Sequence, residues 1–354
     1  MISIKNSPLY LDNASTTKID DRVLSEMMPF FNENFGNPSA NNFHSIKPKE
    51  AIEKSRQKVS KLLNCESSQI IFNSGSTEGI NTVLKSLFFE SIGSGKNHLI
   101  VSGIEHKAVI ETSKYLETIG CKVTYLKIDK SGVVDLEHLY NSITSKTFLI
   151  SVMLANNETG VIQPLSEVIS FAHSKGVPVF TDATQGVGKI KINLKKLDVD
   201  YLCLSAHKIN GPKGVGALFV KNKESISPLL HGGGQENGLR GGTYNVAGIV
   251  GLGKASEIAL KEFEDRINYY KLERKKLLEK FINSSGIENF KSTKKLPNII
   301  SITLYTNNED FLNINRDLFS ASTGSACSAS IIEDSHVLSL IPGIDPKKVI
   351  RISL

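Results

Sequence analysis

The feature that most constrains this chain is a regular alternation of short apolar runs and amphipathic stretches between residues 97 and 220. The apolar runs are HLIVSGI (98–104), KVTYLKI (122–128), FLISVMLA (148–155), VPVFTDA (177–183), DYLCLSA (200–206) and VGALFV (215–220). The stretches between the first four runs have the pattern of helices. Strands separated by helical crossovers predict a mostly parallel sheet with helices on both faces, which is the core of a large α/β domain.

A second domain is expected after this alternation, because 354 residues exceed the usual length of one domain. Residues 255–283 carry apolar side chains at helical spacing between many charges, which predicts one long helix. We expect this helix to lead into a smaller α+β domain. The predicted division gives residues 14–255 to the large domain, and residues 1–13 and 256–354 to the small one.

The composition restricts the surroundings and partners of the protein. Hydrophobic residues make up 40% and charged residues 22% of the chain, which is ordinary for a globular protein with a sizeable core. The N-terminus shows no secretion signal and no apolar run reaches membrane-spanning length, so a cytoplasmic location is expected. The net charge of +6 is spread over patches such as residues 271–280 and 291–295. These patches favour solvated helix faces over nucleic-acid binding, while an acidic protein partner stays open.

The four cysteines predict neither disulfides nor a structural metal site. Cys65, Cys121, Cys203 and Cys327 are far apart and form no CxxC pair or zinc-ligand spacing. The first three are expected to be packing residues. Cys327 differs, because residues 320–330 read SASTGSACSAS and hold no side chain larger than threonine. Such a segment fits either a flexible carrier of a reactive thiol or a tight turn of small residues around a buried one.

A candidate phosphate-binding loop follows the apolar residues IIF (70–72), where SGSTEG (74–79) precedes a predicted helix. Successive backbone amides at a helix N-terminus, with the hydroxyls of Ser76 and Thr77 added, suit a phosphate dianion. The alternative is an ordinary helix start, in which Ser76 or Thr77 caps the helix and Glu78 lies in its first turn.

Two further candidate residues lie where predicted strands end, the position at which ligands bind in open α/β sheets. Asp182 follows VPVF (177–180) after one residue, and a buried carboxylate there needs a cation, either a protonated ring nitrogen or an arginine or lysine. Lys208, flanked by Ser205 and His207, follows another strand, and poor solvation would lower the pKa of its amine and favour Schiff-base chemistry. Each feature alone fits an ordinary turn. Together, a phosphate loop, a strand-end aspartate and a strand-end lysine are what pyridoxal phosphate requires.

The chain as a whole resembles the cysteine desulfurases of the NifS/IscS type, which are class V, fold-type I pyridoxal-phosphate enzymes. The blocks that carry the resemblance, in the order of the family, are YLDNASTT (10–17), FGNPSA (35–40), SGSTEG (74–79), EHKAV (105–109), ANNETGVIQP (155–164), TDATQ (181–185), SAHKINGPKGVGAL (205–218), HGGGQE (231–236), RGGT (240–243), STGSACSAS (322–330) and IRISL (350–354). The resemblance implies a seven-stranded sheet of mostly parallel strands, pyridoxal 5'-phosphate as cofactor and a homodimer.

The resemblance also implies a role for each residue that matches a family motif. Lys208 would hold the cofactor covalently, Asp182 would pair with its pyridine nitrogen, and His106 would stack on its ring and relay protons. Gln185 would contact the phenolic oxygen of the coenzyme. The phosphate would be bound by Ser76, Thr77, Ser205 and His207, and by Thr243 of the other subunit. Asn157 and Arg351 would bind the substrate carboxylate. Cys327, on a mobile loop at about residues 320–330, would accept the sulfur. A histidine at a helix start is more often structural, so the role of His106 rests on the motif alone.

The implied reaction converts L-cysteine to L-alanine. The amine of Lys208 would remove the α-proton, and Cys327 would take the sulfur as a persulfide for delivery to a sulfur-acceptor or scaffold protein. Two alternatives stay open, namely a class V aminotransferase or lyase that does not use Cys327, and a non-enzymatic scaffold descended from such enzymes. No metal, no membrane and no direct nucleic-acid partner is expected.

Two departures from the family pattern affect these expectations. The chain stops at Leu354, where family members usually continue with further helices, so either the small domain is minimal or the chain is truncated. Residues 305–323 match the family imperfectly, which leaves the length of the thiol-bearing loop open. The destination of the sulfur is also open among iron–sulfur clusters, tRNA thiolation, cofactor synthesis and DNA phosphorothioation, with selenocysteine as an additional candidate substrate.

Overall fold

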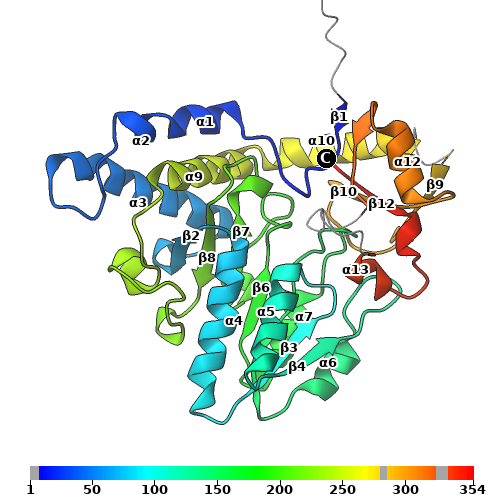
Figure 1. The fold of residues 1–354 in the computed structure, drawn as a ribbon, viewed down its shortest axis with the longest axis horizontal. Coiled ribbons are helices and arrows are strands. Elements are labelled where there is room, and N and C mark those ends of the chain that lie inside the picture. Colours follow the sequence, from blue (N-terminus) through cyan, green and yellow to red (C-terminus); the bar gives the residue numbers. More distant parts are fainter. Residues whose placement is uncertain (1–7, 280–284, 324–333) are drawn as a thin grey trace, which may run out of the picture.

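A seven-stranded sheet forms the centre of the protein, which is described by a computed structural model over residues 8–279, 285–323 and 334–354 (Figure 1). Its strands, in spatial order, are β2 (Ile70–Asn73), β8 (Gly216–Val220), β7 (Tyr201–Ser205), β6 (Val179–Asp182), β5 (Thr147–Ser151), β3 (His98–Ser102) and β4 (Lys122–Leu126). The pairs from β7 to β4 are parallel, whereas β8 is antiparallel to both of its neighbours. The predicted α/β fold with a mostly parallel sheet is confirmed, with β8 as its reversed strand.

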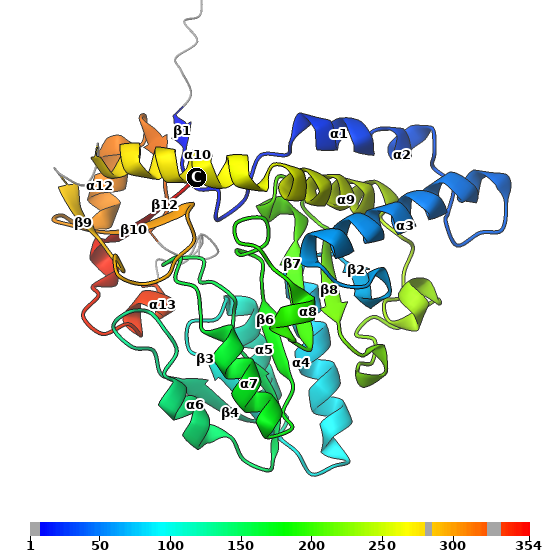
Figure 2. The ribbon, with the colours of Figure 1, turned by 180° about the vertical axis from the view of Figure 1, so that it is seen from behind.

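Helices cover both faces of this sheet (Figures 1 and 2). The helices of this part of the chain are α1 (Asp21–Met27), α2 (Pro29–Asn32), α3 (Phe43–Leu63), α4 (Ser76–Ile92), α5 (Lys107–Thr118), α6 (Leu136–Ser142), α7 (Leu165–Ser174), α8 (Leu194–Leu197) and α9 (Val246–Lys261). Helices α4 and α5 lie on one face, and α3, α7 and α9 lie on the other.

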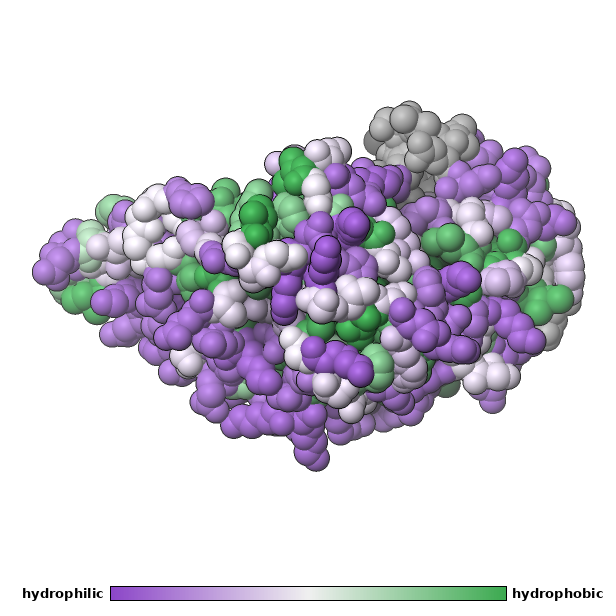
Figure 3. Space-filling model, turned by 90° about the horizontal axis from the view of Figure 1, so that it is seen from below, coloured by the Kyte–Doolittle hydropathy of each residue, from purple (hydrophilic) through white to green (hydrophobic). Residues whose placement is uncertain are grey.

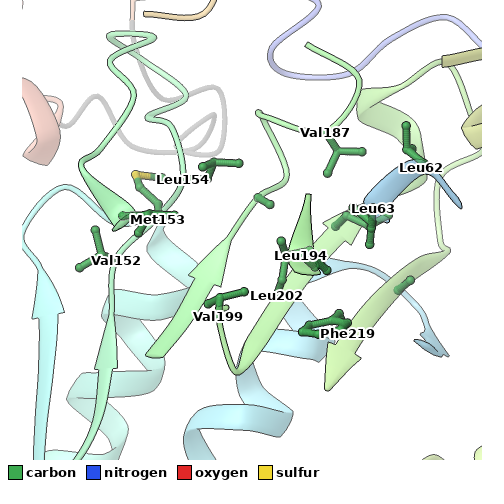
Figure 4. Close-up of a cluster of buried hydrophobic side chains, with 14 of the residues drawn as sticks. Leu62, Leu63, Val152, Met153, Leu154, Val187, Leu194, Val199, Leu202 and Phe219 are labelled. Carbon is green, nitrogen blue, oxygen red and sulfur yellow. The ribbon is translucent and has the colours of Figure 1, made fainter. Parts of the chain in front are cut away.

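The strands feed two separate cores because successive side chains point to opposite faces. On β3, Leu99 and Val101 pack toward α4 and α5, whereas Ile100 packs in the core that holds α3, α7 and α9. Part of this second core appears in Figure 4, where Leu202 and Phe219 of the sheet lie near Leu63 of α3. A sheet buried on both faces explains why its strands read as continuous apolar runs rather than as alternating ones.

The C-terminal part of the chain forms a smaller sheet beside the large one. Strands β9 (Gly286–Glu288), β10 (Ile299–Leu304) and β12 (Val349–Ser353) form an antiparallel sheet in the order β12-β10-β9. The N-terminal strand β1 (Leu9–Tyr10) pairs in parallel with β11 (Phe319–Ser320). The short helices of this part are α12 (Asn308–Asn315) and α13 (His336–Ser339).

The prediction of one long helix over residues 255–283 is wrong. Helix α9 begins earlier, at Val246, and ends at Lys261; α10 (Phe263–Leu277) begins after a break at Glu262. The break has φ −98° and ψ 17°, and the Glu262 carboxylate accepts hydrogen bonds from Arg22. No helix in the described ranges is long and apolar enough to cross a lipid bilayer.

Candidate active site

A cavity of about 250 Å³ lies at the carboxyl ends of the parallel strands, where the large sheet meets the smaller one. We call it the front cavity. Its lining residues are Ala14, Ser15, Ser76, Thr77, Glu105, His106, Lys107, Met153, Ala155, Asn157, Glu158, Asp182, Thr184, Gln185, Ser205, His207, Lys208, His336 and Arg351. Every site residue predicted from the sequence is in this lining except Thr243 and Cys327. Thr243 is exposed and lies outside the cavity, and Cys327 lies outside the described residues.

One end of the front cavity is a cluster of hydroxyl groups at the start of α4. The Ser76 hydroxyl lies 2.5 Å from that of Thr184 and 3.0 Å from that of Ser205, and the Ser76 amide donates to the Ser205 hydroxyl at 2.8 Å. The residue that caps α4 is Gly75, with φ +146° and no side-chain cap bond. The alternative in which Ser76 or Thr77 caps the helix is therefore wrong, and the hydroxyl of Ser76 points to the cluster instead.

This end of the cavity fits a phosphate group by its donor set. Amides at the N-terminus of a helix and several hydroxyls supply hydrogen-bond donors without a fixed positive charge. A Cβ atom at Gly75 would lie 3.3 Å from the Ser205 Oγ, so glycine keeps this approach open. His207 lies beside the cluster with its Nδ1 3.1 Å from the Thr16 Oγ1. Burial and the nearby cations Lys208, Lys213 and Lys189 lower the pKa of His207 to about 4, so its ring is neutral at pH 7.

Asp182, Gln185 and Lys208 are the residues to which the resemblance assigns contacts with the coenzyme ring and aldehyde. They lie at or just after the ends of the adjacent strands β6 and β7, as predicted. Asp182 ends β6 and is 6% exposed, and its Oδ1 accepts a hydrogen bond from the Thr184 amide at 2.9 Å. Lys208 ends the short turn that follows β7, and its Nζ donates to the carbonyls of Ala14 and Ser15, each at 2.6 Å. Gln185 Nε2 donates to the same Ala14 carbonyl at 2.9 Å. The tips of Gln185 and Lys208 therefore meet at one point of the cavity wall.

His106 both caps a helix and lines the cavity. Its Nδ1 accepts a hydrogen bond from the Ala108 amide at 3.1 Å at the start of α5. The capping bond fixes the orientation of the ring and leaves the proton of a neutral imidazole on Nε2. His106 therefore has the structural role that is usual for a histidine at a helix start, and it also lines the cavity.

The other end of the cavity holds buried charged groups. Arg351 of β12 is 2% exposed, and its Nη2 donates to the Asp12 carboxylate at 2.6 Å and to the Ser15 hydroxyl at 2.8 Å. Its Nη1 donates to the Asn157 carbonyl at 2.9 Å, whereas its Nε has no hydrogen-bond partner among the described residues. Arg351 lines the cavity, and a guanidinium in the wall of a cavity fits a carboxylate ligand there.

Two buried glutamates were not predicted from the sequence. Burial raises the pKa of Glu105 to about 8, against the hydrogen bonds that its Oε1 accepts from the Ser102 hydroxyl and the Met153 amide. Burial also raises the pKa of Glu158, whose Oε2 accepts a 2.5 Å hydrogen bond from the Ser335 hydroxyl. Both residues lie inside motifs quoted above, EHKAV and ANNETG, but nothing in these motifs shows that the carboxyl groups are buried.

Ser335 and His336, which follow the thiol-bearing segment in the chain, also lie at the charged end of the cavity and were not predicted from the sequence. Ser335 caps α13, and His336 lines the cavity with its Nε2 3.0 Å from the Glu105 carbonyl. A carbonyl only accepts, so His336 carries a proton on Nε2. Both contacts join positions more than 170 residues apart in the chain, which spacing in the sequence cannot reveal.

The other three cysteines are packing residues, as predicted. Cys121 and Cys203 are buried in the core under α4 and α5, and Cys65 is half-buried beside the other core. Burial raises the pKa of Cys65 and of Cys121 to about 12, and it also raises the pKa of Cys203 well above its ordinary value. Thiols that stay protonated at neutral pH are poor nucleophiles.

Comparison with known proteins identifies the relatives of this architecture. The family described as aminotransferase class-V matches residues 9–354. A cysteine desulfurase IscS of Clostridium botulinum is 42% identical over 341 residues, which cover 94% of this chain and 85% of the relative.

Solved structures agree with this comparison. A NifS-like protein is 40% identical, with a TM-score of 0.90 over 98% of this chain and 93% of its own. A structure described as SspA in complex with cysteine is 36% identical, with a TM-score of 0.84 over 98% of both chains.

Proposed function

The chain belongs to the class-V aminotransferase family and, within it, to the cysteine desulfurases, and we propose that its front cavity removes sulfur from L-cysteine by means of pyridoxal 5'-phosphate. The observation that carries the proposal is the convergence of the hydroxyl cluster, Asp182, Lys208 and Arg351 on one cavity. Enzymes of this family depend on pyridoxal phosphate, which supplies an aldehyde for amines and a ring that withdraws electrons from the substrate's α-carbon. The hydroxyl cluster would hold its phosphate, Asp182 its pyridine nitrogen, Gln185 its phenolic oxygen and Lys208 its aldehyde.

The residues of the chain have separate tasks in the proposed reaction. Arg351 and Asn157 bind the carboxylate of L-cysteine, and the position of both residues in the lining of the front cavity supports this role. The Nζ of Lys208 takes the proton from the α-carbon as a general base. His106, whose ring is held by its capping bond, lines the cavity and relays protons there.

Cys327 is the proposed sulfur acceptor. Its thiolate attacks the sulfur of the substrate, so a sulfur–sulfur bond forms while the carbon–sulfur bond breaks. The electron pair of the broken bond goes to the carbon, which takes up a proton and leaves as L-alanine. Two thiols thus give one persulfide and one alanine without an external oxidant, and a reducing thiol then releases sulfide.

A homodimer belongs to the same proposal and has support in the surface of the protein. Phe31, Phe35 and Phe43, on α2, α3 and the loop between them, are 61%, 68% and 80% exposed. Figure 3 shows hydrophobic side chains at the narrow end of the molecule, where these elements lie. Exposed apolar groups of this size fit a subunit interface. Thr243 is exposed and lies outside its own chain's cavity, which supports the implied contact with the other subunit's phosphate. We also propose a cytoplasmic location and transfer of the sulfur to acceptor or scaffold proteins, on the resemblance to the family.

The experiment that tests this function follows sulfur from L-cysteine labelled with ³⁵S. We expect the coenzyme-loaded protein to form alanine and a persulfide on Cys327, which dithiothreitol removes as sulfide. Cys327→Ser should keep its bound coenzyme and form no persulfide, whereas the control Cys65→Ser should behave as the wild type. Sulfide release by Cys327→Ser at the wild-type rate would refute the role of Cys327 and favour a lyase that does not use this thiol.

A further inference from the structure

Lys189 is a buried lysine that the proposed reaction does not use. The residue is 6% exposed, and no salt bridge joins it to a carboxylate anywhere in the described ranges. Its Nζ donates a hydrogen bond to the main-chain carbonyl of Lys208. An amine removed from water in this way costs free energy, so its contact with Lys208 needs a physical reason.

The segment that carries Lys189 also carries two coenzyme residues. The chain turns after Asp182, with the amides of Gly186 and Val187 donating to the Ala183 carbonyl at 2.9 and 3.0 Å. The amide of Lys189 in turn donates to the Gly186 carbonyl at 3.0 Å. One short turn therefore supplies Asp182 and Gln185 to the front cavity and Lys189 to the main chain behind it.

This turn is packed directly against the main chain that follows Lys208. Gly188 has φ +72°, and a Cβ atom there would lie 3.2 Å from the Cγ2 of Ile209 and 3.4 Å from the Cβ of Ala259. Glycine thus serves both the left-handed backbone and the close approach. The turn that carries Lys189 is therefore in close contact with Ile209, the residue after Lys208.

The other carbonyls of the turn that holds Lys208 are satisfied by other parts of the chain. The Ala206 carbonyl accepts from the amides of Ile209 and Gly211, each at 3.0 Å. The His207 carbonyl accepts from the amide and the hydroxyl of Thr17, each at 2.9 Å. Lys189 supplies the donor for the carbonyl of Lys208 itself, and a main-chain group shielded from water needs such a partner.

We propose that Lys189 is a positioning residue for Lys208, whose carbonyl it binds so that the coenzyme-binding amine leaves the main chain in a fixed direction. This inference rests on the proposed function, because it takes Lys208 as the residue that holds the coenzyme. Lys189 itself touches neither coenzyme nor substrate.

The electrostatic surroundings of Lys189 agree with this role. Burial, with Arg266 of α10 and Lys208 as further causes, lowers the pKa of Lys189 to about 7. A neutral amine still donates a hydrogen bond, so it can hold the carbonyl without a buried positive charge beside Lys208. A rear cavity of about 540 Å³ borders Lys189, and its other charged residues are Glu262, Asp265, Arg266 and Glu273.

The test replaces Lys189 by methionine, which keeps the length of the side chain and removes the donor. Lys191→Met is the matched control, since Lys191 lies two residues further on, is 76% exposed and pairs with Glu264 on the surface. Three quantities are compared: amide hydrogen exchange of residues 206–211 in the coenzyme-free protein, the pH titration of the visible coenzyme band, and kcat and KM for L-cysteine.

Lys189→Met should still bind the coenzyme on Lys208, but with faster amide exchange at residues 206–211. We expect kcat to fall by about 10- to 100-fold at a nearly constant KM, because small displacements of a catalytic group have effects of this size. The midpoint of the coenzyme titration should also move away from the wild-type value, because the amine of Lys208 is no longer held in a fixed direction relative to the groups around the coenzyme. Lys191→Met should match the wild type in all three quantities.

The proposal is overturned if Lys189→Met loses only thermal stability, with wild-type exchange, titration and kcat measured well below its unfolding temperature. If Lys189→Met does not fold, Lys189→Gln replaces it; this shorter donor should give intermediate values, and wild-type values would again overturn the proposal. Failure of the proposed function looks different, because the wild type itself would then carry no coenzyme on Lys208. Amide exchange in the coenzyme-free protein would still decide whether Lys189 restrains this turn.

Discussion

The two ends of the front cavity are built from different chemical groups and from different parts of the chain. At the phosphate end, Ser205 ends β7, Thr184 follows the neighbouring strand β6 and Ser76 begins α4, and all three contribute neutral hydroxyls. At the carboxylate end, Arg351 comes from the smaller sheet and is paired with Asp12 near the N-terminus. We call these the hydroxyl end and the charged end.

This difference between neutral and charged groups indicates how each end of the cavity would respond to substitutions. Neutral groups can be removed one at a time, because each contributes about one hydrogen bond and leaves no charge behind. A buried ion pair responds otherwise, since removal of one partner leaves the other charged and unpaired in a dry site. We therefore expect substitutions at the charged end to have larger effects than substitutions at the hydroxyl end.

The largest effect is expected for Arg351→Met. The change leaves Asp12 without its buried cation, and we expect a loss of about 3–5 kcal/mol in the free energy of unfolding, measured by urea denaturation. The KM for L-cysteine should rise at least tenfold through the loss of its carboxylate partner. Arg22→Met is the control, because the pairs of Arg22 with Asp20 and Glu262 lie at the surface and are each worth about 0–1 kcal/mol. Equal losses for the two variants would contradict the contrast between a buried and an exposed pair.

The second effect concerns Glu105 and depends on pH. The pKa of Glu105 is about 8 in the folded protein and 4.5 for an ordinary glutamate, so the stability that its proton contributes is complete below pH 4.5 and is lost as the pH rises to about 8. Glu105→Gln cannot ionise, and its amide oxygen keeps the bonds from Ser102 and Met153. The stability of the variant relative to the wild type should therefore grow by up to about 1.4 kcal/mol per pH unit across this window.

Thermal unfolding at pH 5, 6, 7 and 8 measures this difference. The control is Glu111→Gln, at a carboxylate that is 62% exposed on α5. A pH-independent difference for Glu105→Gln would show that this carboxyl group is already ionised in the folded protein at pH 5.

The smallest effect is expected for Ser76→Ala at the hydroxyl end. One donor to the phosphate is lost, while the amides at the start of α4 and the Ser205 and Thr184 hydroxyls remain. The affinity for pyridoxal phosphate should fall by about 5- to 10-fold, in line with roughly 1 kcal/mol for one hydrogen bond. Equilibrium dialysis of the coenzyme measures it, with Ser174→Ala at the end of α7 as the control. If the loss of coenzyme affinity in Ser76→Ala corresponded to about 3–5 kcal/mol, the size expected for the unfolding free energy lost in Arg351→Met, the expected difference between the two ends would be contradicted.

The hydroxyl end could be predicted from the sequence much better than the charged end. Apolar runs locate the carboxyl ends of the strands, where ligands bind, and Asp182, Ser205 and Lys208 could be selected because several such features occur together. The contacts of Ser335 with Glu158 and of His336 with Glu105 could not be predicted, since they depend on how the smaller sheet packs on the larger one.

Local details also needed the structure. The cap of α4 is Gly75 rather than a hydroxyl residue because the Ser76 side chain bonds across to Thr184 and Ser205. The long helical pattern after residue 255 is interrupted at Glu262, where the carboxylate is held by Arg22, which is 240 residues away. Tertiary contacts decide both features, and a periodic pattern contains no information about them.

The most direct measurement of the central claim, that the front cavity holds pyridoxal phosphate on Lys208, is borohydride reduction of the coenzyme-loaded protein followed by peptide mass spectrometry. Reduction makes the bond between the coenzyme and its lysine permanent. We expect the pyridoxyl group on the peptide that contains Lys208, and we expect Lys208→Ala to carry none. A pyridoxyl group on Lys107 or Lys189, with Lys208 unmodified, would contradict the account.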